Sequence, residues 1–305
     1  RFAGLSPVAD LGCGIGGDAL ALAGVAGRLL AVERNPVRLR FARHNLSVYN
    51  RARKTGFLQA NILRLPARLP ALAALFADPA RRVPGGRRTF QPNRYTPPLS
   101  ALLDAFARRP MGVKVGPGLD FAALPFEGEV EVVSLGGEVK EAVLWLGELA
   151  TPGVRRRATL LPAGVTLTDA LPAACPVGPL TGFLYEPDGA IIRAGLVEQA
   201  GARLGLHRLD PHIAYLCGDA PLQSPLVTGY RVEASLPLRW KAINRHLQAH
   251  GIARLNIKQR GTGLSPEGVA ARLKPPREGV ERTLILLRMG DEHRALICRR
   301  LGRGA

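Results

Sequence analysis

Asp10-Leu-Gly12-Cys-Gly14-Ile-Gly16-Gly17-Asp18 is a glycine-rich stretch at the end of a short apolar run, residues 5–12, and a helical apolar pattern follows it at 17–26. Glycines in such a turn let the chain reverse tightly and let its backbone approach a ligand without a Cβ clash. The same run also satisfies the dinucleotide pattern GxGxxG, so a nicotinamide-binding turn is an alternative interpretation. The stretch therefore predicts a ligand-binding turn after a first strand.

Strand and helix patterns alternate outward from this turn. We expect strands at residues 28–33, 56–60, 72–76, 111–115 and 129–135, and helices at 36–49, 99–108 and 138–149. Alternating units of this length are typical of α/β proteins with a parallel, doubly wound, Rossmann-like sheet. Because crossovers are right-handed, the glycine-rich turn is expected to open at the carboxyl edge of that sheet.

Three acidic positions are expected at the same edge. Asp10 lies at the end of the first strand, where its carboxylate can face a cationic amino acid moiety. Glu33 ends the second strand 23 residues later, where it can accept both hydroxyls of a ribose. Asp78 ends the fourth strand, where a reacting group would lie. A nicotinamide site has no role for Asp10 or Asp78, so this interpretation is disfavoured.

This arrangement resembles the class I S-adenosylmethionine-dependent methyltransferases over most of residues 5–150. The resemblance implies that S-adenosylmethionine is the cofactor, with the acid-and-glycine turn on its methionine part and Glu33 on its ribose. Asn61 stands at the position that holds the adenine amine. The cofactor contacts implied in this way are Asp10, Gly12, Gly14, Gly16, Asp18, Glu33, Asn61 and Asp78.

Each of these residues also has a simpler interpretation. Asp18 could cap the helix that follows it. Cys13 could fill space in the turn. Glu33 could be a solvated loop acid.

Asp78-Pro79-Ala80-Arg81-Arg82 is similar to the Asp/Asn-Pro-Pro-aromatic motif of methyltransferases that act on exocyclic amines of nucleic acids. The resemblance implies catalytic roles for Asp78, Pro79 and Arg81. Ala80 and Arg81 depart from the motif and remove the aromatic residue that stacks on a flipped base. Phe90, Tyr95 or the Arg81 guanidinium could take that role. The alternative is a loop whose arginines only face water.

The chain carries a net charge of +18 with a pI of about 11.0, which favours a polyanionic partner. A compositional bias without functional meaning is the alternative, since only six of the 42 basic residues are lysine. The excess is concentrated in residues 79–115 and 231–305. Residues expected to contact RNA in these two segments are Arg82, Arg87, Arg88, Lys241, Arg245, Lys258 and Arg260, and the last four are expected to lie close together.

Residues 231–305 predict a small α+β unit after a Pro- and Gly-rich region. This unit resembles the THUMP-like domain that follows the catalytic domain in a family of bacterial class I methyltransferases, and the stretch 186–190 (EPDGA) fits the same family. The resemblance implies RNA binding. We therefore expect a methyltransferase domain at 1–155, a connecting region at 156–230 with a helix at 190–204, and a THUMP-like domain at 231–305. Trp240 is expected to anchor the core of this last domain rather than to stack on a base.

The remaining features restrict the class of protein. Four cysteines lie far apart without a CxxC pair, which favours reduced cytoplasmic thiols over a zinc site or disulfides. His246 and His250 lack an evident third ligand, so no metal is expected. No apolar run approaches the roughly 18 residues that span a membrane. The chain opens without a methionine directly before a strand, so a preceding segment is expected.

Together these patterns predict a cytoplasmic S-adenosylmethionine-dependent methyltransferase acting on a base of tRNA or rRNA. Two alternatives stay open: a methyltransferase of a protein or small molecule, and a non-catalytic RNA-binding protein that retains the cofactor fold. The sequence is silent on oligomeric state.

Overall fold

The computed structural model describes residues 1–65, 71–81, 89, 91–106, 109–121, 123–124 and 126–304. The chain divides into two compact units, each treated separately below. Unit 1 comprises residues 1–133 and 139–157, and unit 2 comprises residues 134–138 and 158–305. Most of the segment 156–230, expected as a connecting region, clusters with unit 2. The three-part division predicted from the sequence stays a prediction.

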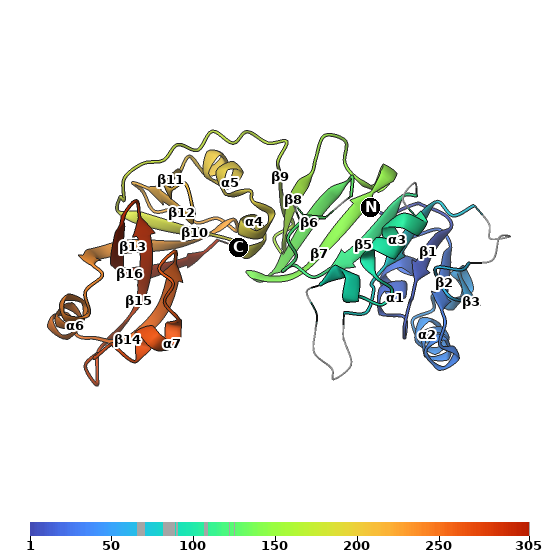
Figure 1. The fold of residues 1–305 in the computed structure, drawn as a ribbon, viewed down its shortest axis with the longest axis horizontal. Coiled ribbons are helices and arrows are strands. Elements are labelled where there is room, and N and C mark those ends of the chain that lie inside the picture. The colour runs from blue at the N-terminus through green and yellow to red at the C-terminus, as the bar shows by residue number, and fades with distance from the viewer. Residues whose placement is uncertain are drawn as a thin grey trace. The chain divides into compact units, whose positions relative to one another are not determined.

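Unit 1 alternates strands and helices from its start (Figure 1). The strands are β1 (Val8–Leu11), β2 (Leu29–Glu33), β3 (Thr55–Gln59), β4 (Ala74–Ala77), β5 (Met111–Val115), β6 (Glu129–Leu135) and β7 (Glu138–Leu146). The helices are α1 (Gly17–Val25), α2 (Pro36–Val48) and α3 (Leu99–Phe106), with single 3₁₀ turns at Ala52–Lys54, Pro92–Arg94 and Gly147–Leu149.

The strands of unit 1 lie in the order β3-β2-β1-β4-β5-β7-β6. The first five are parallel, and β7 runs antiparallel to β5. The chain proceeds outward from β1 in one direction through β2 and β3, and in the other through β4 and β5. β1 and β4 therefore flank the topological switch point, where open α/β sheets bind ligands at the carboxyl ends of their strands. The predicted α/β class with a doubly wound parallel core is confirmed.

The helix expected at 138–149 is wrong, because these residues form β7. Gly136 and Gly137 have φ angles of +61° and +89°, so the two glycines turn the chain from β6 into β7 as a hairpin. Residues 142–146 are all buried. A strand covered on both faces shows a continuous apolar run, and periodicity cannot distinguish that run from a helix.

Unit 2 contains the strands β8 (Arg156–Leu161), β9 (Val165–Thr168), β10 (Phe183–Pro187), β11 (His207–Asp210), β12 (Ile213–Gly218), β13 (Val227–Pro237), β14 (Ile252–Arg260), β15 (Val280–Met289) and β16 (Glu292–Arg303). Its helices are α4 (Gly189–Ala194), α5 (Val197–Leu204), α6 (Trp240–Ala249) and α7 (Pro266–Ala270). The single helix expected at 190–204 is wrong. Gly195, with φ +68°, ends α4 in the left-handed conformation, and α5 starts anew.

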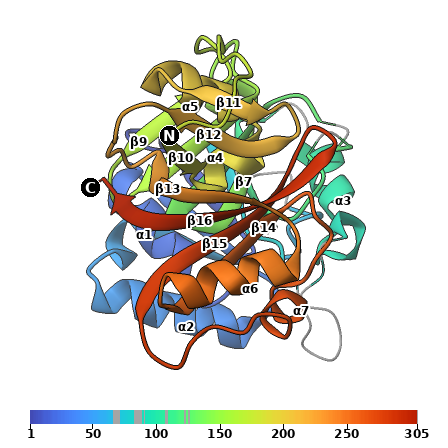
Figure 2. The same cartoon turned by 90° about the vertical axis from the view of Figure 1, so that its left-hand side faces the viewer.

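A seven-stranded sheet in the order β11-β12-β10-β13-β16-β15-β14 forms the centre of unit 2. One face packs against α6 and α7 through a cluster that includes Ile243, Leu286 and Ile297 (Figure 2). The other face carries a separate cluster that includes Tyr230 and Ile285. Alternating side chains along each strand thus supply two cores, and the expected small α+β unit is confirmed.

Candidate active site in unit 1

A cavity of about 440 Å³ lies at the carboxyl ends of β1, β2 and β4, at the topological switch point. Most of the residues that the sequence singled out for cofactor or acceptor binding line it: Gly12, Gly14, Asp18, Glu33, Asn61, Asp78 and Pro79. Asp10, Gly16 and Arg81 are outside this lining. The structure therefore brings the predicted strand-end residues together around one space.

Gly16 has a packing role in the turn that leads into α1. It is the N-cap residue of that helix and has a φ angle of +93°. A Cβ at this position would lie 2.9 Å from Leu46 Cδ1 and 3.2 Å from Ala42 Cα, both on α2. A side chain here would be strained by the backbone conformation and crowded by α2, so Gly16 lets the turn pack against α2 while Gly12 and Gly14 line the cavity.

Glu33 is fixed by the backbone around it. The side chain is only 6% exposed, which rules out a solvated loop acid. Its Oε2 accepts a hydrogen bond from the Gly14 amide at 3.1 Å, and its Oε1 accepts one from the Asn35 amide at 2.9 Å. Each carboxylate oxygen has further acceptor capacity, so the pair can still accept two hydroxyl groups of a ligand in the cavity.

Asn61 follows β3 and lines the same cavity as the glycine turn. Its Oδ1 accepts a hydrogen bond from the Leu63 amide at 3.0 Å, which orients the side chain. A carbonyl oxygen has a second lone pair, so Asn61 can still accept from an amine such as that of adenine.

Asp10 is a buried acid with an unsatisfied oxygen. It is 2% exposed, and its Oδ2 has no hydrogen-bond partner within the described residues. Burial, followed by the charges of Asp18 and Asp78, raises the pKa of Asp10 to about 8. Orphaned buried polar atoms are rare, and a cation bound nearby would satisfy this one. The residues present thus fit the α-ammonium group of S-adenosylmethionine.

Lys114, on β5, connects three carboxylates beside the cavity. Its Nζ lies 3.2 Å from Asp18 Oδ1, 3.4 Å from Asp78 Oδ2 and 3.3 Å from Glu141 Oε2. Burial opposes the charge of this ammonium, but the three acids outweigh burial and raise the pKa of Lys114. Sequence reasoning missed this cluster, because it counted Lys114 with the basic surface residues of its segment.

Asp18 does not cap α1, although capping was one interpretation of it. The N-cap of the helix makes no side-chain hydrogen bond, and Asp18 lies inside the first turn. Its carboxylate accepts from Lys114 instead.

The acceptor side of the cavity is more open. The Asp78 side chain is 37% exposed, and Pro79, Ala80, Thr96 and Pro97 continue the lining beside it. The suggestion that Tyr95 stacks on a base is wrong. Tyr95 is 2% exposed, and its hydroxyl oxygen accepts a hydrogen bond from a buried backbone amide.

Arg81 is half-buried, and its carbonyl oxygen accepts from the Thr89 amide at 2.8 Å. Arg82, Arg87, Arg88 and Phe90 lie outside the described residues.

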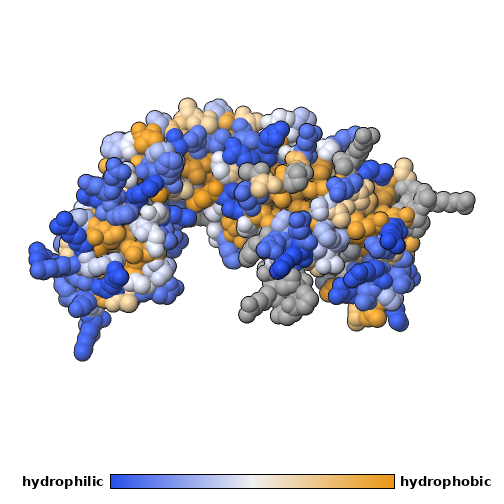
Figure 3. Space-filling view, in the orientation of Figure 1, coloured by the Kyte–Doolittle hydropathy of each residue, from blue (hydrophilic) through white to orange (hydrophobic). Residues whose placement is uncertain are grey.

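The basic residues proposed for RNA contact in unit 2 fall into two groups. Lys241 and Arg245 are exposed on α6, at the end of unit 2 where hydrophilic residues stand out in Figure 3. Lys258 and Arg260 are on the face of the sheet opposite α6, because the alternate residues of β14 pack toward the α6 cluster. The expectation that these groups lie close together is therefore wrong.

Trp240 is half-buried and packs against the cluster beneath α6, and the Arg272 guanidinium lies 5.3 Å from its ring centroid. This environment agrees with a core anchor. All four cysteines are buried and unpaired. Within the described residues, no group of three potential metal ligands occurs, and none of the helices is long and apolar enough to cross a bilayer.

Known proteins resemble this chain in sequence and in fold. The family model "THUMP domain-like" matches residues 227–300. Two proteins from strains of Mycobacterium tuberculosis (CDC 1551 / Oshkosh and H37Rv), each described as an uncharacterized S-adenosylmethionine-dependent methyltransferase, are 39% identical over 272 residues. The match covers 88% of this chain and 73% of each relative. A crystal structure from Porphyromonas gingivalis W83, described as a candidate methyltransferase, shares the fold with a TM-score of 0.78 and 24% identity, over 98% of this chain and 78% of that one.

Proposed function

Since the chain belongs to the S-adenosylmethionine-dependent methyltransferases, with S-adenosylmethionine as its cofactor, we propose that it methylates a base in RNA. The observation that carries the proposal is the THUMP domain-like match at residues 227–300, because THUMP domains belong to RNA-modifying enzymes. Residues 231–305, which overlap this match, contain 16 of the 42 basic residues, as expected for a surface that meets phosphates.

The cavity of unit 1 supplies the positions for cofactor binding. Asp10 would pair with the α-ammonium group, Glu33 would accept the ribose hydroxyls and Asn61 would accept from the adenine amine. The backbone of Gly12 and Gly14 would lie against the methionine part, because neither residue carries a Cβ.

Bound S-adenosylmethionine supplies a methyl group on a sulfonium, which is already an activated leaving group. The protein therefore needs mainly to hold the nucleophile in line with that methyl group. Asp78, at the open side of the cavity, would accept a hydrogen bond from an exocyclic amine and orient its nitrogen. Lys114, 3.4 Å from Asp78, holds the carboxylate in place by an ion pair. Pro79 lines the cavity next to it.

Transfer of labelled methyl groups from S-adenosylmethionine tests the proposal. RNA and protein extract are prepared from cells that lack the gene, so that the target is unmethylated, and a reaction without acceptor is run beside them. Asp78→Ala is compared with Asp104→Ala, which removes the same charge from an exposed position on α3.

We expect label in RNA with the unmodified chain and with Asp104→Ala, and a loss of at least about a hundredfold with Asp78→Ala. Label in protein alone would replace RNA by a protein acceptor. Cofactor binding without transfer to any acceptor would contradict an RNA methyltransferase and favour a non-catalytic role.

A further inference from the structure

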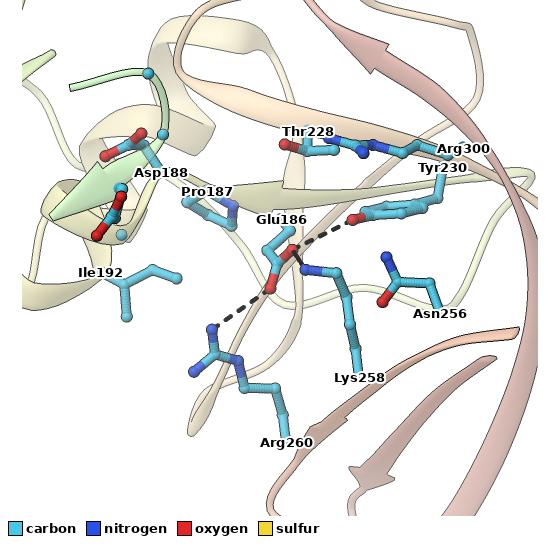
Figure 4. A pocket seen from close by; sticks show the side chains of 14 residues that line it. Glu186, Pro187, Asp188, Ile192, Thr228, Tyr230, Asn256, Lys258, Arg260 and Arg300 are labelled. Atoms are coloured by element: carbon cyan, nitrogen blue, oxygen red, sulfur yellow. Dashed lines mark hydrogen bonds and ion pairs between the residues drawn. The ribbon is translucent and has the colours of Figure 1, made fainter. Parts of the chain in front are cut away.

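Unit 2 contains a second cavity, of about 460 Å³, and none of the candidate active site residues lines it (Figure 4). Four strands of the sheet contribute polar side chains to it: β10 with Glu186, β13 with Thr228 and Tyr230, β14 with Asn256, Lys258 and Arg260, and β16 with Arg300. The volume falls within the range of roughly 300–1,000 Å³ that small-molecule sites occupy. The cavity is therefore large enough for one nucleotide.

Glu186 contacts three of the other side chains that line this cavity. Lys258 Nζ lies 2.6 Å from its Oε2, and Arg260 Nη2 lies 3.5 Å from its Oε1. The Tyr230 hydroxyl donates to Oε2 at 3.3 Å. The Glu186 side chain is 14% exposed, and these three contacts satisfy both oxygens of its carboxylate within the protein. Its partners are thereby held with fixed side-chain directions, as the dashed lines in Figure 4 show.

Hydrogen-bond donors are left in excess after these contacts. Lys258 and Arg260 use part of their N–H groups on Glu186, and an ammonium has three donors and a guanidinium five. The Arg300 side chain is exposed and has no hydrogen-bond or ion-pair partner within the described part of the chain. These three basic side chains come from two strands, so they can surround a ligand from more than one side.

Two further carboxylates line the cavity and must be weighed against this excess. Asp188 is buried, and its Oδ1 accepts from the Ala190 amide at 2.8 Å as the N-cap of α4. Glu138 also lines the cavity and has an interaction of its own. Asp188 caps the helix start and also has a further interaction, like Glu138, while Lys258 and Arg260 keep N–H groups beyond those that Glu186 uses.

We propose that this cavity binds the phosphate group of a nucleotide. Phosphate oxygens are strong acceptors, and Arg and Lys hydrogen bonds to them are charge-assisted. Thr228 and Asn256 add neutral donors beside the basic groups. Glu186 acts as a positioning residue, because it orients Lys258 and Arg260 before a ligand arrives. As a contact with RNA the site deepens the proposed function and rests on it, while a free nucleotide would use the same phosphate chemistry.

Arg300→Gln tests the site, with Arg299→Gln as the matched control. Both arginines are exposed neighbours on β16, and the alternation of the strand directs Arg299 to the other face. Three probes are used with the whole chain: inorganic phosphate, adenosine monophosphate and a single-stranded RNA oligonucleotide. Equilibrium binding is measured for each, and thermal unfolding verifies that both variants fold.

For each probe that binds, we expect Arg300→Gln to raise the Kd about tenfold and Arg299→Gln to change the Kd by less than about twofold. Binding of adenosine monophosphate would identify a free nucleotide as a source, and binding of the oligonucleotide alone would identify RNA. Equal effects of the two variants would overturn the proposal and leave a structural ion-pair network. Absence of binding for all three probes would overturn it as well.

The two proposals fail in different ways. If the chain methylates RNA and Arg300→Gln and Arg299→Gln affect the transfer equally, the proposed phosphate site is refuted and the proposed RNA methyltransferase activity stands. If adenosine monophosphate binds in a way that depends on Arg300 but no methyl group is transferred to RNA, the phosphate site stands and the proposed function is refuted.

Discussion

Asp10 makes cofactor binding depend on pH in a way that the structure specifies. Its pKa is raised to about 8, chiefly by burial, so the carboxyl is protonated in the empty protein at pH 7. Pairing with the α-ammonium group requires the ionised form. An α-amino group has a pKa of about 7.7–8.0, so the ligand keeps its proton between pH 5 and pH 7. Over this range, binding must release the proton of Asp10.

The magnitude follows from the protonation equilibrium. Each pH unit below the pKa reduces the ionised fraction of Asp10 about tenfold, which corresponds to about 1.4 kcal/mol. The Kd for S-adenosylmethionine should therefore fall about a hundredfold from pH 5 to pH 7. Asp10→Asn removes the titrating group and should make Kd independent of pH. At pH 7 the unmodified chain should therefore bind the cofactor more tightly than Asp10→Asn, and the difference should shrink as the pH falls.

Isothermal titration calorimetry in buffers of different ionisation enthalpy measures both Kd and the number of protons released. We expect close to one proton released at pH 6 from the unmodified chain and none from Asp10→Asn. Asp104→Asn, on the exposed side of α3, is the control and should keep the full pH dependence. A flat Kd between pH 5 and pH 7, or a slope that persists in Asp10→Asn, would refute the role assigned to Asp10.

Three further predictions test the local arguments. Gly16→Ala should lower the free energy of unfolding by about 2–4 kcal/mol, because the added Cβ would meet Leu46. Gly12→Ala should lower it by about 1 kcal/mol, since no atom lies within 4 Å of a Cβ at that position. Chemical denaturation compares the two variants. Lys114→Met should slow methyl transfer and lower the melting temperature, because three carboxylates lose their shared cation, while Lys114→Arg should keep most of both. Hydrogen bonds from two arginines and a backbone amide outweigh the burial of Glu129 and lower its pKa, so the ionised residue stabilises the fold above pH 4.5. Glu129→Gln should reduce the free energy of unfolding by about 2 kcal/mol at pH 7. Thermal unfolding should show that the difference between the two proteins shrinks as the pH falls.

The fold of the first half of the chain could be predicted where local signals suffice. β1, the glycine turn and α1 are contiguous, and their glycines and apolar periodicity lie within about 20 residues. β7 could not be identified from periodicity, because residues 142–146 are buried on both sides and read as an apolar helix. The signal that was available is Gly136-Gly137 between two apolar runs, which favours a hairpin.

The helix wrongly expected at 138–149 also explains why the cluster around Lys114 was not predicted. Glu33 and Asp78 could be predicted, because the carboxyl ends of parallel strands meet at one edge of the sheet. The cluster around Lys114 could not, because its partners lie on α1, directly after β4 and on β7, which are remote in sequence. Glu141 reaches Lys114 only when β7 pairs antiparallel with β5, which aligns Val143 with Lys114. A helix at 138–149 removes that pairing and hides the cluster.

In unit 2 the net charge alone was a poor guide to where a polyanion binds. Lys241 and Lys258 look equivalent in a count of basic residues, yet Lys241 faces solvent on α6 while Lys258 is paired with Glu186. The alternation Asn256, Lys258, Arg260 on β14 places three polar side chains on one face and the apolar Leu255 and Ile257 on the other. That pattern was legible in the sequence, but Glu186 lies 72 residues from Lys258 and joins it only through the sheet. At this site a carboxylate orients two basic side chains beside Arg300, which has no hydrogen-bond or ion-pair partner among the residues that the structure describes, and this arrangement distinguishes a built site from a charged surface. The Arg300→Gln and Arg299→Gln pair should therefore separate specific phosphate binding from the general attraction of a chain with a net charge of +18.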